Sequence, residues 1–104
     1  MQIQTNTDRH IQGSDALSSQ VETAVTSALD RFIDRVTRVE VHLSDENSGK
    51  GGSHDKRCMM EARLEGRSPT AVTHEAATVE AAIDGAAAKL ARSIESTLGR
   101  LRDA

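Results

Sequence analysis

The spacing of the apolar residues is the feature of this chain that most constrains its fold. Apolar residues recur either at every second position, as in a strand with one covered face, or at three- and four-residue intervals, as in an amphipathic helix. The two periods alternate along the chain and therefore predict an order of elements. The predicted strands cover residues 1–7, 38–44, 57–65 and 70–75, and the predicted helices cover 14–33 and 78–101.

Both predicted helices begin at residues suited to capping. Ser14 and Asp15 follow Gly13, and Thr78 precedes the last apolar stripe; their side-chain oxygens can accept hydrogen bonds from the free N–H groups of a first turn. The stripe of the last helix consists of Val79, Ile83, Ala87, Leu90, Ile94, Leu98 and Leu101. The first helix has a similar set in Leu17, Val21, Val25, Ala28, Leu29 and Phe32.

The order of elements is strand, helix, three strands, helix. This order predicts an α+β fold of two layers, in which a four-stranded mixed sheet carries both helices on one face. A length of 104 residues fits one domain spanning residues 1–104. The polar, glycine-rich segment 45–56 predicts a flexible hairpin loop. On this assignment Cys58 faces inward, and Val72 and His74 share a face of the last strand.

The composition restricts the kind of ligand that this chain can bind. Aromatic residues make up 1% of the chain, with Phe32 alone, so the core must consist of aliphatic residues and methionine. The chain also lacks the aromatic platforms on which single-stranded bases stack. Its net charge of −3 argues against a general duplex-binding protein, which normally has a strong positive excess. Any nucleic acid would therefore be held through its backbone or its shape.

The sequence indicates a cytoplasmic protein without a membrane anchor. Cys58 is the only cysteine, so no disulfide can form within the chain. The first residues lack the charged and then apolar pattern of a signal peptide. No apolar run approaches the roughly 20 residues that would span a bilayer.

Charge is sorted by face on the predicted last helix. Lys89, Arg92 and Arg100 fall on one side of the helix, and the acidic residues Glu80, Asp84 and Glu95 fall on the other. Three cations on one face could follow a line of phosphates, because long basic side chains position a protein on nucleic acid without reading its sequence. The alternative interpretation is an ordinary solvated surface, with Arg102 pairing the acidic side.

The residues that most often bind metals or act in catalysis show no suitable spacing. His42, His54, Cys58 and His74 match none of the compact ligand pairs of zinc sites, so we expect no metal site. An inward-facing strand cysteine such as Cys58 normally behaves as a small core residue rather than a nucleophile. We therefore assign no catalytic residue, expect no cofactor and predict that the protein is not an enzyme.

Several short segments, taken in order, resemble the ribosome hibernation-promoting factor and protein Y family, whose members are also described as ribosome-associated inhibitors and sigma-54 modulation proteins. The similarity covers nearly the whole chain and is to the short form of the family. The segments are Met1-Gln2-Ile3, Asp15-Ala16-Leu17, Phe32 with Asp34-Arg35-Val36, Glu80-Ala81-Ala82-Ile83-Asp84-Gly85 and Lys89-Leu90-Ala91-Arg92.

This resemblance implies a fold related to double-stranded-RNA-binding domains and a function on the small ribosomal subunit. Family members act in stress or stationary phase by occupying the channel of messenger and transfer RNA. Their basic helix residues contact ribosomal RNA, and Lys89, Arg92 and Arg100 stand at matching positions of the last helix. The implied partners are ribosomal RNA and ribosomal proteins of the small subunit.

The chain also departs from the pattern of this family. Its first helix carries small polar or acidic residues where members often have lysine or arginine, and the chain ends at Ala104 without the extra C-terminal domain of longer members. These residues are Ser18, Ser19, Glu22, Thr23, Thr26 and Ser27. A second hypothesis therefore stays open, in which a protein-interaction or self-associating module, such as a homodimer, keeps the fold and has lost ribosome binding.

Overall fold

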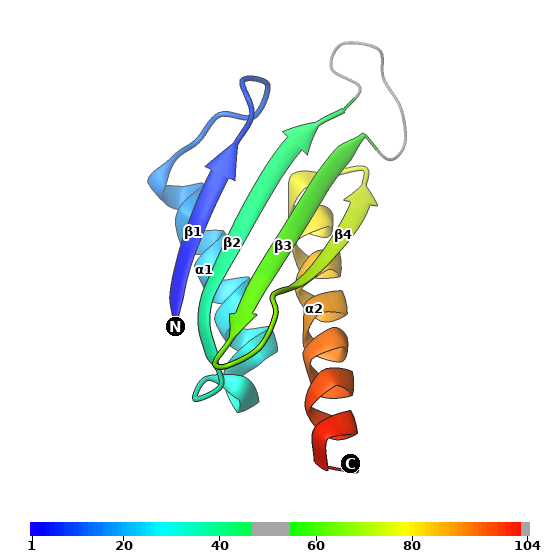
Figure 1. Ribbon diagram of the computed structural model, residues 1–104. Coiled ribbons are helices and arrows are strands. Elements are labelled where there is room, and N and C mark those ends of the chain that lie inside the picture. The colour runs from blue at the N-terminus through cyan, green and yellow to red at the C-terminus, as the bar shows by residue number, and fades with distance from the viewer. Residues whose placement is uncertain (47–54, 103–104) are drawn as a thin grey trace.

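The described part of the chain folds into four strands and two long helices, whose arrangement Figure 1 shows. The computed structural model describes residues 1–46 and 55–102, and for residues 100–102 it describes the backbone alone. The predicted loop 45–56 and His54 therefore lie largely or wholly outside the described residues. The elements are β1 (Gln2–Thr7), α1 (Asp15–Leu29), a 3₁₀ turn (Asp30–Phe32), β2 (Val36–Asp45), β3 (Lys56–Leu64), β4 (Thr70–Ala76) and α2 (Val79–Arg102).

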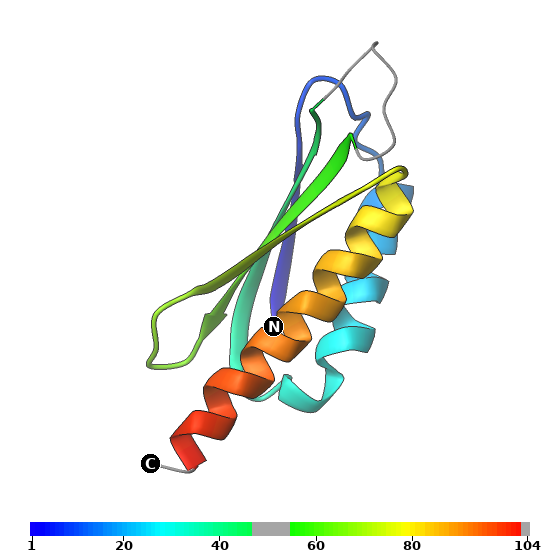
Figure 2. The same cartoon turned by 90° about the vertical axis from the view of Figure 1, so that its right-hand side faces the viewer.

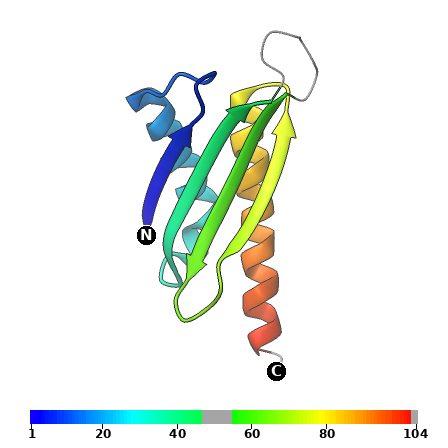
Figure 3. The same cartoon turned by 45° about the horizontal axis from the view of Figure 1, so that its top comes forward.

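The strands form one mixed sheet in the order β1-β2-β3-β4 (Figure 3). β1 runs parallel to β2, and the other neighbours are antiparallel. Both helices lie over the same face of the sheet, and no described element covers the opposite face (Figure 2). The predicted two-layer α+β fold is therefore confirmed.

The core lies between the sheet and the helices. Alternate strand residues point into it, as the two-residue period predicts. The buried strand residues are Val36, Val39, Val41, Leu43, Cys58, Met60, Ala62, Leu64 and Ala76. The helices contribute Val21, Val25 and Leu29 from α1, and Ala82, Ile83, Ala86, Ala87, Leu90 and Ile94 from α2. Most of these residues are aliphatic because Phe32 is the only aromatic ring available.

Both helices begin at the predicted caps. The Ser14 hydroxyl accepts a hydrogen bond from the Leu17 N–H at 3.0 Å, and the Thr78 hydroxyl accepts one from the Ala81 N–H at 3.1 Å. α2 has 24 residues, but its apolar side chains occupy one face of the helix. Within residues 1–46 and 55–102, no helix combines the length and apolar character needed to cross a lipid bilayer.

The first helix ends earlier than its apolar spacing predicts. The prediction extends to Ile33, whereas α1 ends at Leu29 and a 3₁₀ turn follows. The Ile33 N–H bonds to the Asp30 carbonyl and the Arg35 N–H bonds to the Phe32 carbonyl, which turns the chain towards β2. The turn keeps Phe32 buried and leaves Ile33 47% exposed.

A register shift at the start of β2 positions the side chains discussed below. Val36 pairs with Leu64, and the pairing shifts before Arg38 pairs with Arg63. Such an irregularity lets two residues of one strand oppose one residue of its neighbour. Val36 and Val39 therefore both face the core, and Arg38 lies on the uncovered face of the sheet.

β4 and α2 approach each other closely at one glycine. A Cβ atom added to Gly85 would lie 2.1 Å from His74 Cδ2 and 2.6 Å from His74 Cγ. Val72 and His74 share a face of β4, as predicted, and the structure shows that it is the helix-covered face, where both are half-buried. Gly85 therefore occurs in the middle of a helix because the imidazole ring fills the space of a side chain.

Candidate nucleic-acid interface

The structure describes the side chains of two of the three residues in the predicted basic face of α2, Lys89 and Arg92. The half-buried Lys89 lies against β4, where its Nζ donates a hydrogen bond to the Thr73 carbonyl at 3.0 Å. Arg92 is exposed, and its side chain makes neither an ion pair nor a hydrogen bond within the described residues. The side chain of Arg100 lies outside the described residues. Of the two described side chains, Arg92 is thus the one whose charge is directed at solvent.

An ion pair between α2 and the 3₁₀ turn engages the carboxylate nearest to Arg92 along the helix. Glu95, one turn after Arg92, pairs instead with Arg31 at 2.8 Å. The Arg31 guanidinium also lies 4.8 Å from the centre of the Phe32 ring. Both charged side chains are more than half exposed, so the pair contributes little to stability. Its effect on the surface is to neutralise a carboxylate beside Arg92.

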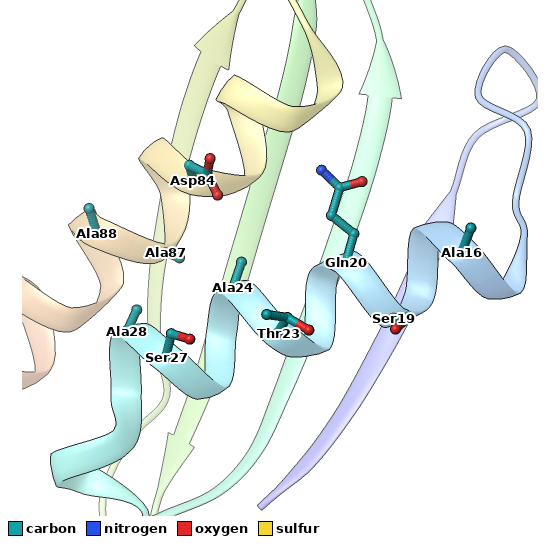
Figure 4. Close-up of a pocket in the computed structure, with 10 residues that line it drawn as sticks. All are labelled: Ala16, Ser19, Gln20, Thr23, Ala24, Ser27, Ala28, Asp84, Ala87 and Ala88. Atoms are coloured by element: carbon teal, nitrogen blue, oxygen red, sulfur yellow. The ribbon is translucent and has the colours of Figure 1, made fainter.

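The α1 helix presents a surface without cations. Between α1 and α2 lies an open groove of about 760 Å³. Figure 4 shows that small side chains from both helices line it, including Ala24 and Ala28 of α1 and Ala87 of α2. Its charged residue is Asp84, and no lysine or arginine contributes to it. Phosphates would not be attracted to this groove.

Sequence reasoning missed a second group of cations, at one end of the sheet. Arg38 of β2 lies directly opposite Arg63 of β3. Arg35 precedes β2, and Arg67 lies in the turn between β3 and β4. Their positions in separate segments gave no periodic signal. The alternation in 57–65 did place Arg63 on the uncovered face, but the β2–β3 register is needed to set it beside Arg38.

Cys58 and the histidines form no activated pair. His74 lies opposite Cys58 in the β3–β4 register, whereas His42 lies on the uncovered face, 3.6 Å from Glu40. Burial raises the pKa of the Cys58 thiol to about 12, so it stays protonated at neutral pH and is a poor nucleophile. Across the described part of the chain, no three His, Cys, Asp or Glu side chains gather as metal ligands would.

The fold and its surfaces define a class of small α+β protein that offers exposed basic groups and a sheet with one free face. Comparison with known proteins then gives the family. The sequence matches, over residues 4–102, the family described as Sigma 54 modulation protein / S30EA ribosomal protein. The chain belongs to this family, and the resemblance to hibernation-promoting factors is confirmed.

Two solved structures share the fold. The N-terminal domain of Thermus thermophilus Protein Y is 28% identical with a TM-score of 0.74, and the match covers 93% of this chain and 99% of that one. A ribosomal subunit interface protein from Coxiella burnetii also has a TM-score of 0.74; the match covers 95% of this chain and 99% of that one. At 17% identity, the second likeness concerns the fold alone. No curated protein matches the sequence.

Proposed function

We propose that this protein binds the small ribosomal subunit and inhibits translation as a hibernation factor. The observation that carries the proposal is the family match over residues 4–102. The similarity to a Protein Y domain over nearly the full length of both chains supports it. A factor of this kind acts in the cytoplasm under stress, and it acts by occupying a site rather than by catalysing a reaction.

We assign the contact with ribosomal RNA to Lys89, Arg92 and Arg100 of α2. Exposed arginine and lysine side chains bind phosphate oxygens and fix the orientation of a protein without reading the base sequence. The Arg92 side chain is exposed and makes no ion pair within the described residues, so its guanidinium group is available to a phosphate. Lys89 would have to exchange its bond to the Thr73 carbonyl for a phosphate, or contact RNA with its remaining N–H groups.

The net charge of −3 limits the affinity of this contact. Few cations take part, and each phosphate contact releases counterions, so binding is expected to weaken steeply as salt increases. The cation-free surface of α1 adds nothing to the attraction. Ribosomal proteins at the same site would then supply part of the contact.

Cell-free translation tests the proposed activity directly. Protein added to small subunits before messenger RNA is expected to lower the yield of product, and protein added after initiation is expected to have less effect, because the channel is already filled. A variant with Arg92→Glu should inhibit less, and Glu22→Gln, which alters charge on α1, serves as its control. Unchanged product yield at a large excess of protein would contradict the proposal.

A second candidate function is self-association or binding of another protein. The groove between α1 and α2 favours it, since small side chains and no cations line this surface. The prediction is a dimer whose population rises with protein concentration and which does not bind small subunits. Sedimentation equilibrium, with Ala24→Glu to block the groove, distinguishes this function from ribosome binding.

A further inference from the structure

One end of the sheet collects arginines from separate parts of the chain. At this end β2 begins and β3 ends (Figure 1). We call the set of four arginines the arginine end; it consists of Arg35, Arg38, Arg63 and Arg67. Arg38 and Arg63 are register partners on the uncovered face, opposite to the face that the helices cover.

Backbone hydrogen bonds hold the segments of the arginine end together. The Glu65 N–H donates to the Arg35 carbonyl at 3.1 Å, and the Arg67 N–H donates to the Leu64 carbonyl at 3.0 Å. The turn also contains Gly66 with φ of 72°, a conformation that favours glycine. The arginines are therefore carried by fixed backbone.

Most of the arginines at this end are not engaged in ion pairs. Arg38 pairs with Glu40 at 3.1 Å and also contacts Gln4. Arg35, Arg63 and Arg67 are exposed and make no ion pair within the described residues. Segments 34–40 and 61–67 hold four arginines and four carboxylates, so the arginine end has no formal excess of charge, and its distinguishing feature is that three of its arginines make no ion pair within the described residues. Like charges directly opposite each other, as at Arg38 and Arg63, destabilise a sheet.

The opposite end of the sheet differs in this respect. Lys56 lies 3.3 Å from both Asp45 and Asp55, and Arg57 lies 2.9 Å from Glu46. Lys56 and Arg57 are thus neutralised by neighbouring carboxylates, whereas Arg9, which follows β1 at the same end of the sheet, is exposed and makes no ion pair within the described residues. Exposed arginines without an ion pair are therefore gathered at the arginine end, three of them against Arg9 alone at the opposite end within the described residues.

We propose that the arginine end is a second binding surface for the phosphate backbone of structured RNA. Arginine forms paired hydrogen bonds with phosphate and remains charged at every physiological pH, so free guanidinium groups on fixed backbone suit this ligand. Phosphates would also relieve the repulsion between Arg38 and Arg63. The inference rests on the proposed ribosome binding, in which it supplies cations that α1 lacks.

The test compares three variants with the natural chain by titration against small ribosomal subunits and against an RNA duplex of about 20 base pairs. One variant neutralises the unpaired arginines: Arg35→Gln, Arg63→Gln and Arg67→Gln. A second replaces the same three by lysine and keeps their charge. The charge-matched control neutralises the opposite end: Arg9→Gln, Lys56→Gln and Arg57→Gln. Thermal unfolding of each variant verifies that it is folded.

The measured quantity is the slope of log Kd against log salt concentration. Loss of three phosphate contacts should lower its magnitude by roughly 2 to 3, at about 0.7–0.9 per contact, and should weaken binding at low salt by roughly tenfold or more. The lysine variant and the control should keep the natural slope. A glutamine variant with the natural slope, or a control that loses as much, would overturn the inference and leave ribosome binding intact.

Failure of the natural chain to bind subunits would instead refute the proposed function. Titration with the RNA duplex then tests phosphate binding at the arginine end separately. Duplex binding that depends on the three arginines would support a phosphate-binding surface in a protein without ribosome affinity. Absence of duplex binding would overturn the inference as well.

Discussion

The contact between Gly85 and His74 makes a strong prediction about packing. Gly85→Ala places a methyl group where the imidazole lies, 2.1 Å from Cδ2 and 2.2 Å from Nε2. The 2.6 Å approach to Cγ matters most, because rotating the ring about χ2 does not move that atom. The whole side chain must change its χ1 rotamer, or β4 and α2 must separate.

The expected size of the effect follows from two opposing contributions. Alanine is favoured over glycine inside a helix by about 1 kcal/mol. Forcing an extra carbon into a packed site costs about 1–3 kcal/mol. Because the contacts are far below van der Waals distance, we expect a net loss of about 1–2 kcal/mol, which lowers Tm by about 5–10 °C in a chain of this size.

A double-mutant cycle isolates this contact. In a His74→Ala background the obstacle is gone, so Gly85→Ala should stabilise the protein by up to about 1 kcal/mol through helix propensity alone. Chemical denaturation followed by circular dichroism measures all four proteins. An equal effect of Gly85→Ala in both backgrounds, or a stabilised single variant, would refute the argument.

Two further predictions concern single side chains. Asp8 accepts hydrogen bonds from the backbone N–H groups of His10, Ile11 and Asp45 at 3.0–3.1 Å, and although desolvation opposes ionisation, these bonds lower the pKa of its carboxyl group. The stabilisation from ionised Asp8 is therefore complete above the pKa of the unfolded chain and is lost as pH falls through the lower pKa of the folded protein. Asp8→Asn should lower the free energy of unfolding by about 1 kcal/mol at neutral pH and should make that free energy depend less on pH in the acid range, as measured by denaturation curves. An unchanged pH dependence would contradict this assignment. The Cys58 thiol, fully buried and with a pKa raised to about 12, should react with a thiol reagent at neutral pH only after unfolding, and rapid labelling of the folded protein would contradict its burial.

The fold could be predicted because local periodicity and tertiary burial agree along most of the chain. The α2 stripe is buried from Ile83 to Ile94, and the strand alternation places Val39, Val41 and Leu43 inward as expected. The end of α1 could not be predicted, since Phe32 continues the helical spacing. A 3₁₀ turn buries the same residue while reversing the chain, and spacing cannot distinguish the two.

The candidate sites depend on neighbours that a single element does not reveal. On an isolated helix, Lys89 and Arg92 appear equivalent, but β4 places a free carbonyl beside Lys89. Arg38 and Arg63 become neighbours only through the shifted β2–β3 register. Likewise, the requirement for glycine at position 85 becomes clear only from the His74 ring that packs against it. Contacts between elements, rather than propensity within them, decide these positions.

The central claim is that the protein binds the small ribosomal subunit through α2. Its most direct test is co-sedimentation with purified small subunits across a salt series, comparing the natural chain with a variant carrying Lys89→Ala, Arg92→Ala and Arg100→Ala. The charge-matched control is the Arg9, Lys56 and Arg57 glutamine variant. We predict binding at low salt that weakens as salt rises, is lost in the α2 variant and is retained in the control. Absence of binding at low salt, or equal binding by the α2 variant, would contradict the claim.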